Sequence, residues 1–316
     1  MTGGAGFIGS HLVTALLDDG LQVTVYDNFS SGSKRSIEEH VGKSGFRIDQ
    51  ADLLDFETLR QAMVGHDLVW HLGANTNIPD GYRKTDMDLK NAVIATCNVL
   101  ESMRLNGIER ILFASTGAVY GSLCYDIYAT ESHGPLLPLS LYAAGKLSCE
   151  AFISAYCSLF DMRGWIFRFG NVVGDRMGHG VIYDFIRKLL SNPTELEILG
   201  DGEQEKSYFL VEECVDGMAY AFRNALLNEQ RPVDIFNLGN ESTTKVTTIA
   251  QTVIEEMGLK DVRTRFTGGT QGWPGDQPRV HLSVEKMRQM GWRAKHTSDE
   301  AVRIATRRML AGLRDG

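Results

Sequence analysis

The chain lacks several features that mark broad classes of protein. No apolar run in its 316 residues approaches the roughly 18 residues that a membrane-spanning helix requires, and no secretory apolar segment opens the chain. Low-complexity segments and internal repeats are absent. Basic residues are in the minority, 32 against 40 acidic ones, and the net charge of −8 argues against nucleic acid or an anionic membrane as a partner.

Cysteine is also scarce and shows no pattern. The five cysteines are odd in number and have no spacing typical of a metal site. We therefore predict free thiols in a reducing compartment and a cytoplasmic location. The histidines show no metal-like spacing either, and we predict no metal site.

What the chain does have is a glycine-rich phosphate loop at residues 2–9. Gly3, Gly6 and Gly9 have the spacing G-x-x-G-x-x-G, which lets backbone N–H groups approach a pyrophosphate at a helix N-terminus. A helix and a strand are predicted to follow, and the strand ends at Asp27. An acidic residue about 20 positions after such a loop is placed to bind the ribose hydroxyls of adenosine, which favours NAD over NADP.

Only Met1 and Thr2 precede the first glycine of this loop. A doubly wound sheet needs a central strand at that point, and strands run about 5–6 residues. We therefore expect the first strand to be missing or truncated and the true N-terminus to lie upstream of Met1. The intact mass of the native protein tests this expectation.

Strands and helices are predicted to alternate well past the midpoint of the chain. The pattern predicts strands at 67–72, 110–115 and 165–169, and long helices at 86–106 and 141–160. This β-α-β rhythm is typical of a parallel sheet with right-handed crossovers. We predict an α/β fold with a Rossmann-type doubly wound parallel sheet.

The rhythm weakens after Asn171, so we divide the chain into two lobes. Residues 1–171 are predicted to form the NAD-binding domain, together with a returning segment near residues 207–240. Residues 172–316 are predicted to form mainly a smaller lobe that binds the substrate. The ligand is expected in the crevice at the carboxyl ends of the strands.

Tyr142 and Lys146 lie four residues apart and therefore share one face of a predicted helix. A nearby ammonium favours the phenolate, as does the positive ring of oxidised nicotinamide, so Tyr142 is predicted to act as a general base near neutrality. Thr116 follows a predicted strand, and its hydroxyl can bridge substrate and tyrosine. Each feature alone is commonplace, but the three together, downstream of a dinucleotide loop, indicate catalysis.

Several segments carry a family pattern: TGGAGFIGSH at 2–11, FASTGAVYG at 113–121, YAAGK at 142–146, RFGNVVG at 168–174 and GWPGD at 272–276. On these motifs the chain resembles the extended short-chain dehydrogenases/reductases. Within that superfamily it is similar to NAD-dependent nucleotide-sugar epimerases/dehydratases of the UDP-glucose 4-epimerase type. The resemblance implies NAD as cofactor, a nucleotide sugar as substrate and a homodimer.

The resemblance also assigns residues to each role. It implies catalysis by Thr116, Tyr142 and Lys146. It implies that NAD is bound by Gly3, Gly6, Phe7, Ile8, Gly9, Asp27, Asn28, Ser31, Gly32, Asp52, Leu53, Leu72, Gly73, Ala74, Thr76, Ser115, Tyr142, Lys146 and Phe169. It implies that the substrate is bound by Thr116, Asn171, Val181, Leu199, Lys206, Tyr208 and Arg279.

The two residues after Thr116 bear on the type of reaction. Dehydratases that resemble this chain carry an Asp-Glu pair there, and decarboxylases usually keep a Glu, whereas this chain has Gly117 and Ala118, which cannot transfer protons. The resemblance thus implies 4-epimerisation through a transient 4-keto sugar, with Tyr142 taking the proton of the 4-hydroxyl. The alternatives are a dehydratase or 4-ketoreductase of nucleotide sugars on the same scaffold, and a non-catalytic NAD-binding sensor.

The chain departs from the family pattern at several positions. Gly145 lies inside a predicted helix, where glycine costs about 1 kcal/mol. Gln271 stands where many relatives have an Arg that clamps the diphosphate, and Arg279 is near enough in sequence to compensate. Val280 aligns with a position that limits the size of the C2 substituent, which implies room for an N-acetyl group.

Overall fold

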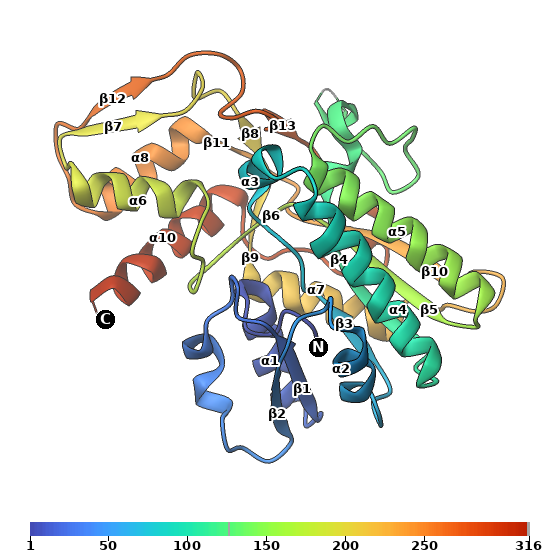
Figure 1. The fold of residues 1–316 in the computed structure, drawn as a ribbon. Helices are drawn as coiled ribbons and strands as arrows, with labels where there is room; N and C mark the ends of the chain where they lie inside the picture. The colour runs from blue at the N-terminus through green and yellow to red at the C-terminus, as the bar shows by residue number, and fades with distance from the viewer. Residues whose placement is uncertain (126, 315–316) are drawn as a thin grey trace. The chain divides into compact units, whose positions relative to one another are not determined.

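The computed structural model describes residues 1–125 and 127–314 (Figure 1). The chain forms two compact units. The first unit contains Met1–Val119, Ser140–Arg168 and Met218–Phe236. The second contains Tyr120–Leu139, Phe169–Gly217 and Asn237–Gly316. The second segment of the first unit ends at Arg168, whereas the boundary was predicted at Asn171. The chain returns to the first unit at Met218–Phe236, and a return was predicted near residues 207–240.

The segment Tyr120–Leu139 was predicted in the first domain but belongs to the second unit. The buried Asn237 side chain holds it there. Its Nδ2 donates to the Ala129 carbonyl at 2.8 Å, and its Oδ1 accepts from the Tyr120 hydroxyl at 2.8 Å. Ala129 also forms a parallel bridge with Leu282. These partners lie more than 100 residues apart, so local sequence patterns do not reveal them.

A parallel sheet organises the first unit. β4 (Arg110–Thr116) lies between β3 (Val69–His71) and β5 (Arg163–Phe169), and β10 (Val233–Leu238) follows β5. β1 (Val23–Asp27) pairs in parallel with β2 (Phe46–Gln50). The strands and intervening helices give the α/β arrangement that the sequence predicts.

Thr2 occupies the place where the sequence predicts a missing or truncated central strand. It forms isolated parallel bridges to Tyr26 of β1 on one side and to His71 of β3 on the other. The Thr2 N–H donates to the Trp70 carbonyl at 2.9 Å. The short segment Met1–Gly3 therefore joins the two groups of strands in the first unit, with Met1 and Gly3 bonded to Tyr26 and Thr2 bonded to Trp70 and Leu72.

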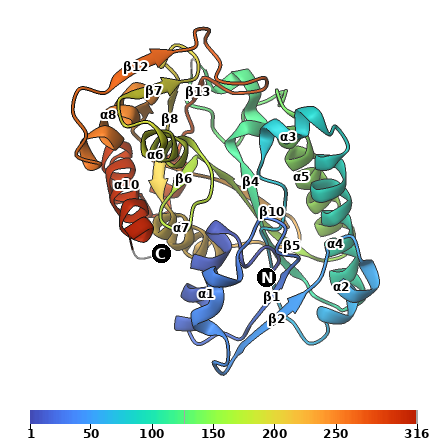
Figure 2. The ribbon, with the colours of Figure 1, turned by 60° about the vertical axis from the view of Figure 1, so that its left-hand side comes forward.

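Helices cover the strands of the first unit: α1 (Phe7–Asp18), α2 (Phe56–Ala62), α3 (Ile78–Arg83), α4 (Ala95–Leu105) and α5 (Leu141–Leu159). The Ser140 hydroxyl caps α5 by accepting the Ala143 N–H at 3.2 Å. α4 and α5 lie side by side (Figures 1 and 2). The predicted helix at 86–106 is α4 preceded by a π-helical turn, η2 (Leu89–Ile94). Buried Val99, Met103 and Phe113 are part of the core beneath these helices.

The second unit is built on short strand pairs and three packed helices. β6 (Asn171–Val173) pairs with β9 (Tyr208–Leu210), and β7 (Glu195–Ile198) pairs with β12 (Arg263–Phe266), both in parallel. β8 (Glu205–Lys206) lies between β11 (Thr244–Lys245) and β13 (Arg279–Val280). The helices are α6 (Val181–Ser191), α8 (Val246–Glu256) and α10 (Ser298–Arg314). The chain also contains α7 (Val211–Asn224) and α9 (Glu285–Gln289).

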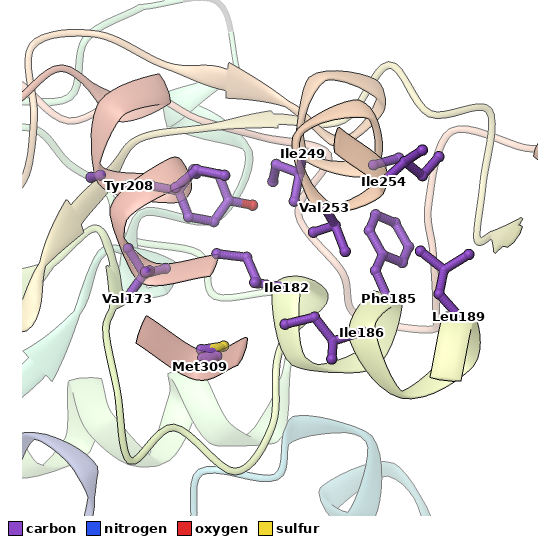
Figure 3. Packing of buried hydrophobic residues seen from close by; sticks show 14 of the residues in the cluster. Val173, Ile182, Phe185, Ile186, Leu189, Tyr208, Ile249, Val253, Ile254 and Met309 are labelled. Atoms are coloured by element: carbon purple, nitrogen blue, oxygen red, sulfur yellow. The ribbon is translucent and has the colours of Figure 1, made fainter. Parts of the chain in front are cut away.

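The core of the second unit lies among α6, α8 and α10. Figure 3 shows Ile182, Phe185 and Ile186 of α6 directed toward Ile249 and Val253 of α8. All five side chains are buried, and burying an aliphatic or aromatic side chain of this size contributes about 1.5–3 kcal/mol. This core fixes the ends of β6 and β9, which carry predicted substrate residues.

The five cysteines are free thiols, as predicted. Four of them are buried and Cys97 is half-buried. None of the helices in the described chain is both long enough and apolar enough to cross a membrane.

Candidate active site

The glycine-rich loop leads from Thr2 directly into α1 and leaves no room for larger residues. Gly3 has a φ of +67°, and a Cβ atom there would lie 2.7 Å from the Gly73 nitrogen. A Cβ atom on Gly9 would lie 2.1 Å from the Gly3 carbonyl oxygen. α1 begins with Gly6 as its N-cap, so its first N–H groups are left for the oxygen atoms of a ligand. This cradle fits a pyrophosphate.

Asp27 ends β1 and faces this loop. Its Oδ2 accepts the Ala5 N–H at 3.0 Å and its Oδ1 accepts the Phe29 N–H at 2.8 Å. Each carboxylate oxygen has a second lone pair, so Asp27 retains capacity to bind a ribose hydroxyl. Next to it, Asn28 Nδ2 donates to Asp52 Oδ2 at 2.9 Å. The structure thus brings together the predicted adenosine-binding residues from two loops.

The residues after β3 meet the same loop. The Gly73 N–H donates to Thr2 Oγ1 at 3.1 Å, and the Leu72 N–H donates to the Thr2 carbonyl at 3.2 Å. A Cβ atom on Gly73 would lie 2.9 Å from Leu53 Cδ1 and one on Gly32 2.8 Å from the Ala5 carbonyl carbon.

The remaining residues assigned to NAD occupy more varied positions. Phe7, Ile8 and Ala74 are half-buried, and Ser31 and Thr76 are exposed. Phe169 is a buried residue of the second unit.

Thr116, Tyr142 and Lys146 meet in the first unit, as predicted. Thr116 is the last residue of β4, and its hydroxyl is near enough to the half-buried Tyr142 side chain to lower the pKa of the phenol. Lys146 lies one turn further along α5 and is buried. Its Nζ donates to the Ala114 carbonyl at 2.6 Å and stands 4.7 Å from the centre of the Phe113 ring. A phenol, a hydroxyl and an ammonium therefore converge at the carboxyl end of β4.

In the second unit, Lys206 forms an ion pair with Asp276, the last residue of the GWPGD segment. Its Nζ lies 2.8 Å from Asp276 Oδ1 and 5.5 Å from the centre of the Trp273 ring. Asp276 Oδ2 accepts the Gly272 N–H at 3.0 Å, and Gln271 Nε2 donates to the Asp276 carbonyl at 3.0 Å. The predicted phosphate-binding lysine is therefore held by a carboxylate of the same unit.

The other predicted substrate residues occupy different environments in this unit. Asn171 and Tyr208 are opposite each other in β6 and β9, and their side chains are hydrogen-bonded. The Tyr208 ring lies in the hydrophobic core (Figure 3), where burial raises the pKa of its hydroxyl. Val181 is half-buried at the start of α6, whereas Leu199 and Arg279 are exposed.

Comparison with known proteins identifies the family. A family model described as the NAD dependent epimerase/dehydratase family matches residues 1–239. The chain belongs to this family. The predicted resemblance is confirmed, and NAD as the cofactor agrees with the family's description.

Similar proteins span nearly the full chain. A putative UDP-glucose 4-epimerase of Methanocaldococcus jannaschii is 30% identical over 310 residues, which cover 96% of this chain and 95% of that protein. UDP-glucuronic acid decarboxylase 1 of Xenopus tropicalis is 31% identical over 264 residues, 82% of this chain and 60% of that protein. The crystal structure of Thermus thermophilus UDP-glucose 4-epimerase in complex with NAD matches with a TM-score of 0.84, 30% identity and 96% coverage of both chains. The α/β fold is confirmed, and the relatives include both epimerases and decarboxylases.

The acid–base properties of the family's tyrosine and lysine differ from the simple expectation. Burial, the largest effect, raises the pKa of Tyr142 to about 12, even though the Thr116 hydrogen bond opposes it. Burial also lowers the pKa of Lys146 to about 8. Without a ligand, burial thus keeps the pKa of Tyr142 high, and the predicted base near neutrality depends on a positive charge such as that of oxidised nicotinamide.

A buried ion pair next to the catalytic residues was not predicted. Glu150 lies one turn after Lys146 on α5, and its Oε2 is 2.7 Å from Arg168 Nη2. The Ser115 hydroxyl donates to Glu150 Oε1. The family resemblance assigns Ser115 to NAD binding, but its hydroxyl donates its hydrogen bond to Glu150 in the interior of the first unit. The only signal of this pair in the sequence is its position near the proposed catalytic residues. Ser115 directly precedes Thr116, and Glu150 lies one helical turn after Lys146.

Proposed function

We propose that the chain is an NAD-dependent 4-epimerase of nucleotide sugars, of the UDP-glucose/UDP-galactose type, that acts through a transient 4-keto sugar. The observation that carries this proposal is that Thr116, Tyr142 and Lys146 meet at the carboxyl end of β4, with Gly117 and Ala118 directly after Thr116. One base is thereby available, while the next two side chains have no group for proton transfer. Epimerisation needs no second acid or base, whereas dehydration does.

In this proposal the first unit holds NAD. The open N–H groups at the start of α1 would bind the pyrophosphate, and Asp27 the adenosine ribose. The Lys146 ammonium would bind the nicotinamide ribose. NAD supplies the acceptor and donor of a hydride when it is bound. Tyr142 would take the proton of the sugar 4-hydroxyl through Thr116 or directly.

The second unit would hold the nucleotide diphosphate. Lys206 is a candidate, but Asp276 neutralises much of its charge. Arg279 is exposed, and it lies opposite Glu205 in the pairing of β13 with β8. We therefore assign the larger share of diphosphate recognition to Arg279, because a guanidinium binds phosphate oxygens in a bidentate manner.

We also propose a homodimer in the cytoplasm. α4 and α5 expose several large apolar side chains: Leu105 is 49% exposed, Phe152 42% and Leu159 72%. Apolar side chains grouped on neighbouring helices are typical of a protein–protein interface. The five free thiols agree with a reducing compartment.

The reaction can be tested by proton NMR. The purified protein is incubated with UDP-, dTDP-, GDP- and CDP-hexoses and with a UDP-uronic acid, without and with added NADH or NADPH, and the anomeric signals are followed. We expect the C4 epimer to appear with no net formation of NADH. A 4-keto or dehydrated product would instead support the dehydratase alternative, and a pentose with release of carbon dioxide from a UDP-uronic acid would support a decarboxylase, as in the Xenopus relative. Net consumption of NADH or NADPH would support a 4-ketoreductase.

A further inference from the structure

Asp88 is a buried carboxylate that the sequence analysis did not single out. It is 2% exposed and immediately precedes η2. Its Oδ1 accepts a hydrogen bond from Asn75 Nδ2 at 3.2 Å, whereas its Oδ2 has no hydrogen-bond partner in the described part of the chain. A buried ionised carboxylate without full hydrogen bonding is costly, so its presence beside a catalytic helix requires an explanation.

Two helical glycines lie against Asp88, one at its carboxylate and the other at its carbonyl oxygen and Cβ atom. A Cβ atom on Gly81 of α3 would lie 2.4 Å from Asp88 Oδ2. A Cβ atom on Gly145 of α5 would lie 3.3 Å from the Asp88 carbonyl oxygen and 3.5 Å from Asp88 Cβ. Glycine inside a helix costs about 1 kcal/mol relative to alanine. α3 and α5 therefore each contain a destabilising glycine at the point where they contact Asp88. This contact gives a structural reason for the presence of Gly145, which departs from the family pattern.

Gly145 lies between Tyr142 and Lys146 on α5, so this contact places Asp88 beside the catalytic pair. The Asp88 charge raises the pKa of both Tyr142 and Lys146. In the opposite direction, burial raises the pKa of Asp88, while Asn75 and Lys146 lower it.

Other groups also act on the pair. The Thr116 hydrogen bond lowers the pKa of Tyr142 and Cys149 raises it, and both Cys149 and Glu150 raise the pKa of Lys146. Cys149 and Glu150 belong to α5, as the pair itself does. Asp88 is thus the negative group that a separate segment of the chain brings to the pair.

We propose that Asp88 is a positioning residue for the Tyr142–Lys146 pair, which acts by holding a buried negative charge next to it. This inference rests on the proposed function, in which Tyr142 is the base. Together with Cys149 and Glu150, the Asp88 carboxylate favours the ammonium form of Lys146 against the effect of burial. It also makes Tyr142 hold its proton until a positive ligand is bound.

The test compares Asp88→Asn with the native protein. Asparagine keeps the shape of the side chain and can still accept the hydrogen bond from Asn75, but it has no charge. Loss of the charge lowers the pKa of both Tyr142 and Lys146, so both limbs of the pH profile of kcat move to lower pH, by about one unit. The matched control is Asp86→Asn, because Asp86 is two residues away, exposed and paired only with Lys90 at the surface. Its profile is expected to coincide with that of the native protein.

A second readout needs no substrate. Because the pKa of Lys146 is lowered to about 8 in the folded chain, the contribution of Lys146 to the free energy of unfolding rises with pH between about 8 and the ordinary lysine value near 10.4. Burial raises the pKa of thiols such as Cys124, which act in the opposite direction, so the comparison is made between Asp88→Asn and the native protein. In Asp88→Asn this rise is expected to begin at a lower pH in urea unfolding experiments. If this rise begins at a lower pH in Asp88→Asn but the native protein does not epimerise any sugar, the proposed function fails and the inference on Asp88 survives.

An unchanged kcat profile together with an unchanged onset of the rise in Asp88→Asn would overturn the inference and leave Asp88 a structural residue. If Asp88→Asn does not fold, Gly81→Ala tests the inference instead. The added Cβ atom displaces Asp88 Oδ2, while the carboxylate keeps its charge. Displacement of the charge is expected to move the pH profile of kcat and that of the free energy of unfolding to lower pH, as in Asp88→Asn, but by a smaller amount. Coincidence of the Gly81→Ala and native profiles would then overturn the inference.

Discussion

Arg168 and Glu150 form an ion pair in the interior of the first unit, with Nη2 and Oε2 2.7 Å apart and side chains only 3% and 5% exposed. A second contact joins Arg168 Nε to Glu150 Oε1 at 3.1 Å. Removing two charges from water is expensive, and such a pair is compensated only when both partners are present. The pair supports Ser115, which directly precedes Thr116.

Glu150→Gln is expected to lower the free energy of unfolding by about 3 kcal/mol, because it leaves the Arg168 charge buried without its counter-ion. Urea unfolding measures this change. The control is Glu57→Gln, which removes the exposed pair with Arg60 and is expected to cost less than about 1 kcal/mol. The double variant Glu150→Leu with Arg168→Met is expected to recover part of the loss. Equal effects of Glu150→Gln and Glu57→Gln would contradict this account.

Tyr142→Phe is expected to lower kcat by about 10²–10⁴-fold, because the phenol oxygen is the proposed base. Binding of NAD, measured by calorimetry, is expected to persist, since the glycine loop and Asp27 are unchanged. Tyr156→Phe is the control on the same helix, because the Tyr156 hydroxyl only contacts Glu101 at 3.4 Å. Equal turnover in Tyr142→Phe and the native protein would favour the sensor alternative.

His71 is expected to make the protein sensitive to acid. It is buried, its ring nitrogens lie 2.7 Å from Thr2 Oγ1 and 2.9 Å from Thr96 Oγ1, and burial lowers its pKa to about 3. Because the folded-state pKa is below the unfolded value of 6.5, the stabilisation is present above pH 6.5 and is lost as pH falls toward 3. Between pH 6.5 and 4.5 the loss amounts to about 2 kcal/mol.

Urea unfolding of His71→Gln at these two pH values checks this prediction. The variant is expected to be less stable than the native protein at the higher pH, because it disturbs two hydrogen bonds, but to lose less stability on acidification. His179→Gln, at an exposed position, serves as the control. A parallel pH dependence of His71→Gln and the native protein would refute the role of His71.

Val280→Tyr is expected to discriminate against N-acetylated sugars. Val280 is buried in β13, and the larger ring would reduce the space that the family resemblance assigns to the C2 substituent. We expect kcat/KM for UDP-N-acetylglucosamine to fall about tenfold relative to that for UDP-glucose. Val280→Ile is the control with a small increase in volume. An unchanged ratio of the two kcat/KM values in a folded Val280→Tyr protein would exclude this position from substrate selection.

The positions of the phosphate loop, Asp27 and the catalytic residues could be predicted because their signals are local. Glycine spacing dictates the turn into α1, and a spacing of four residues places Tyr142 and Lys146 on one helix face. The pKa of Tyr142 could not be predicted, because the cost of burial depends on everything packed around the phenol.

The sequence by itself thus determined the α/β rhythm, the glycine-rich loop and the set of proposed catalytic side chains, since these follow from periodicity and short-range spacing. Only the tertiary structure decided which distant residues surround them. It joined Lys206 to Asp276, attached Ala129 to Asn237, and placed Asp88 against Gly145. These contacts link residues 57 to 108 positions apart, and the cost of burying a charge or polar group is set by such partners rather than by its neighbours in sequence.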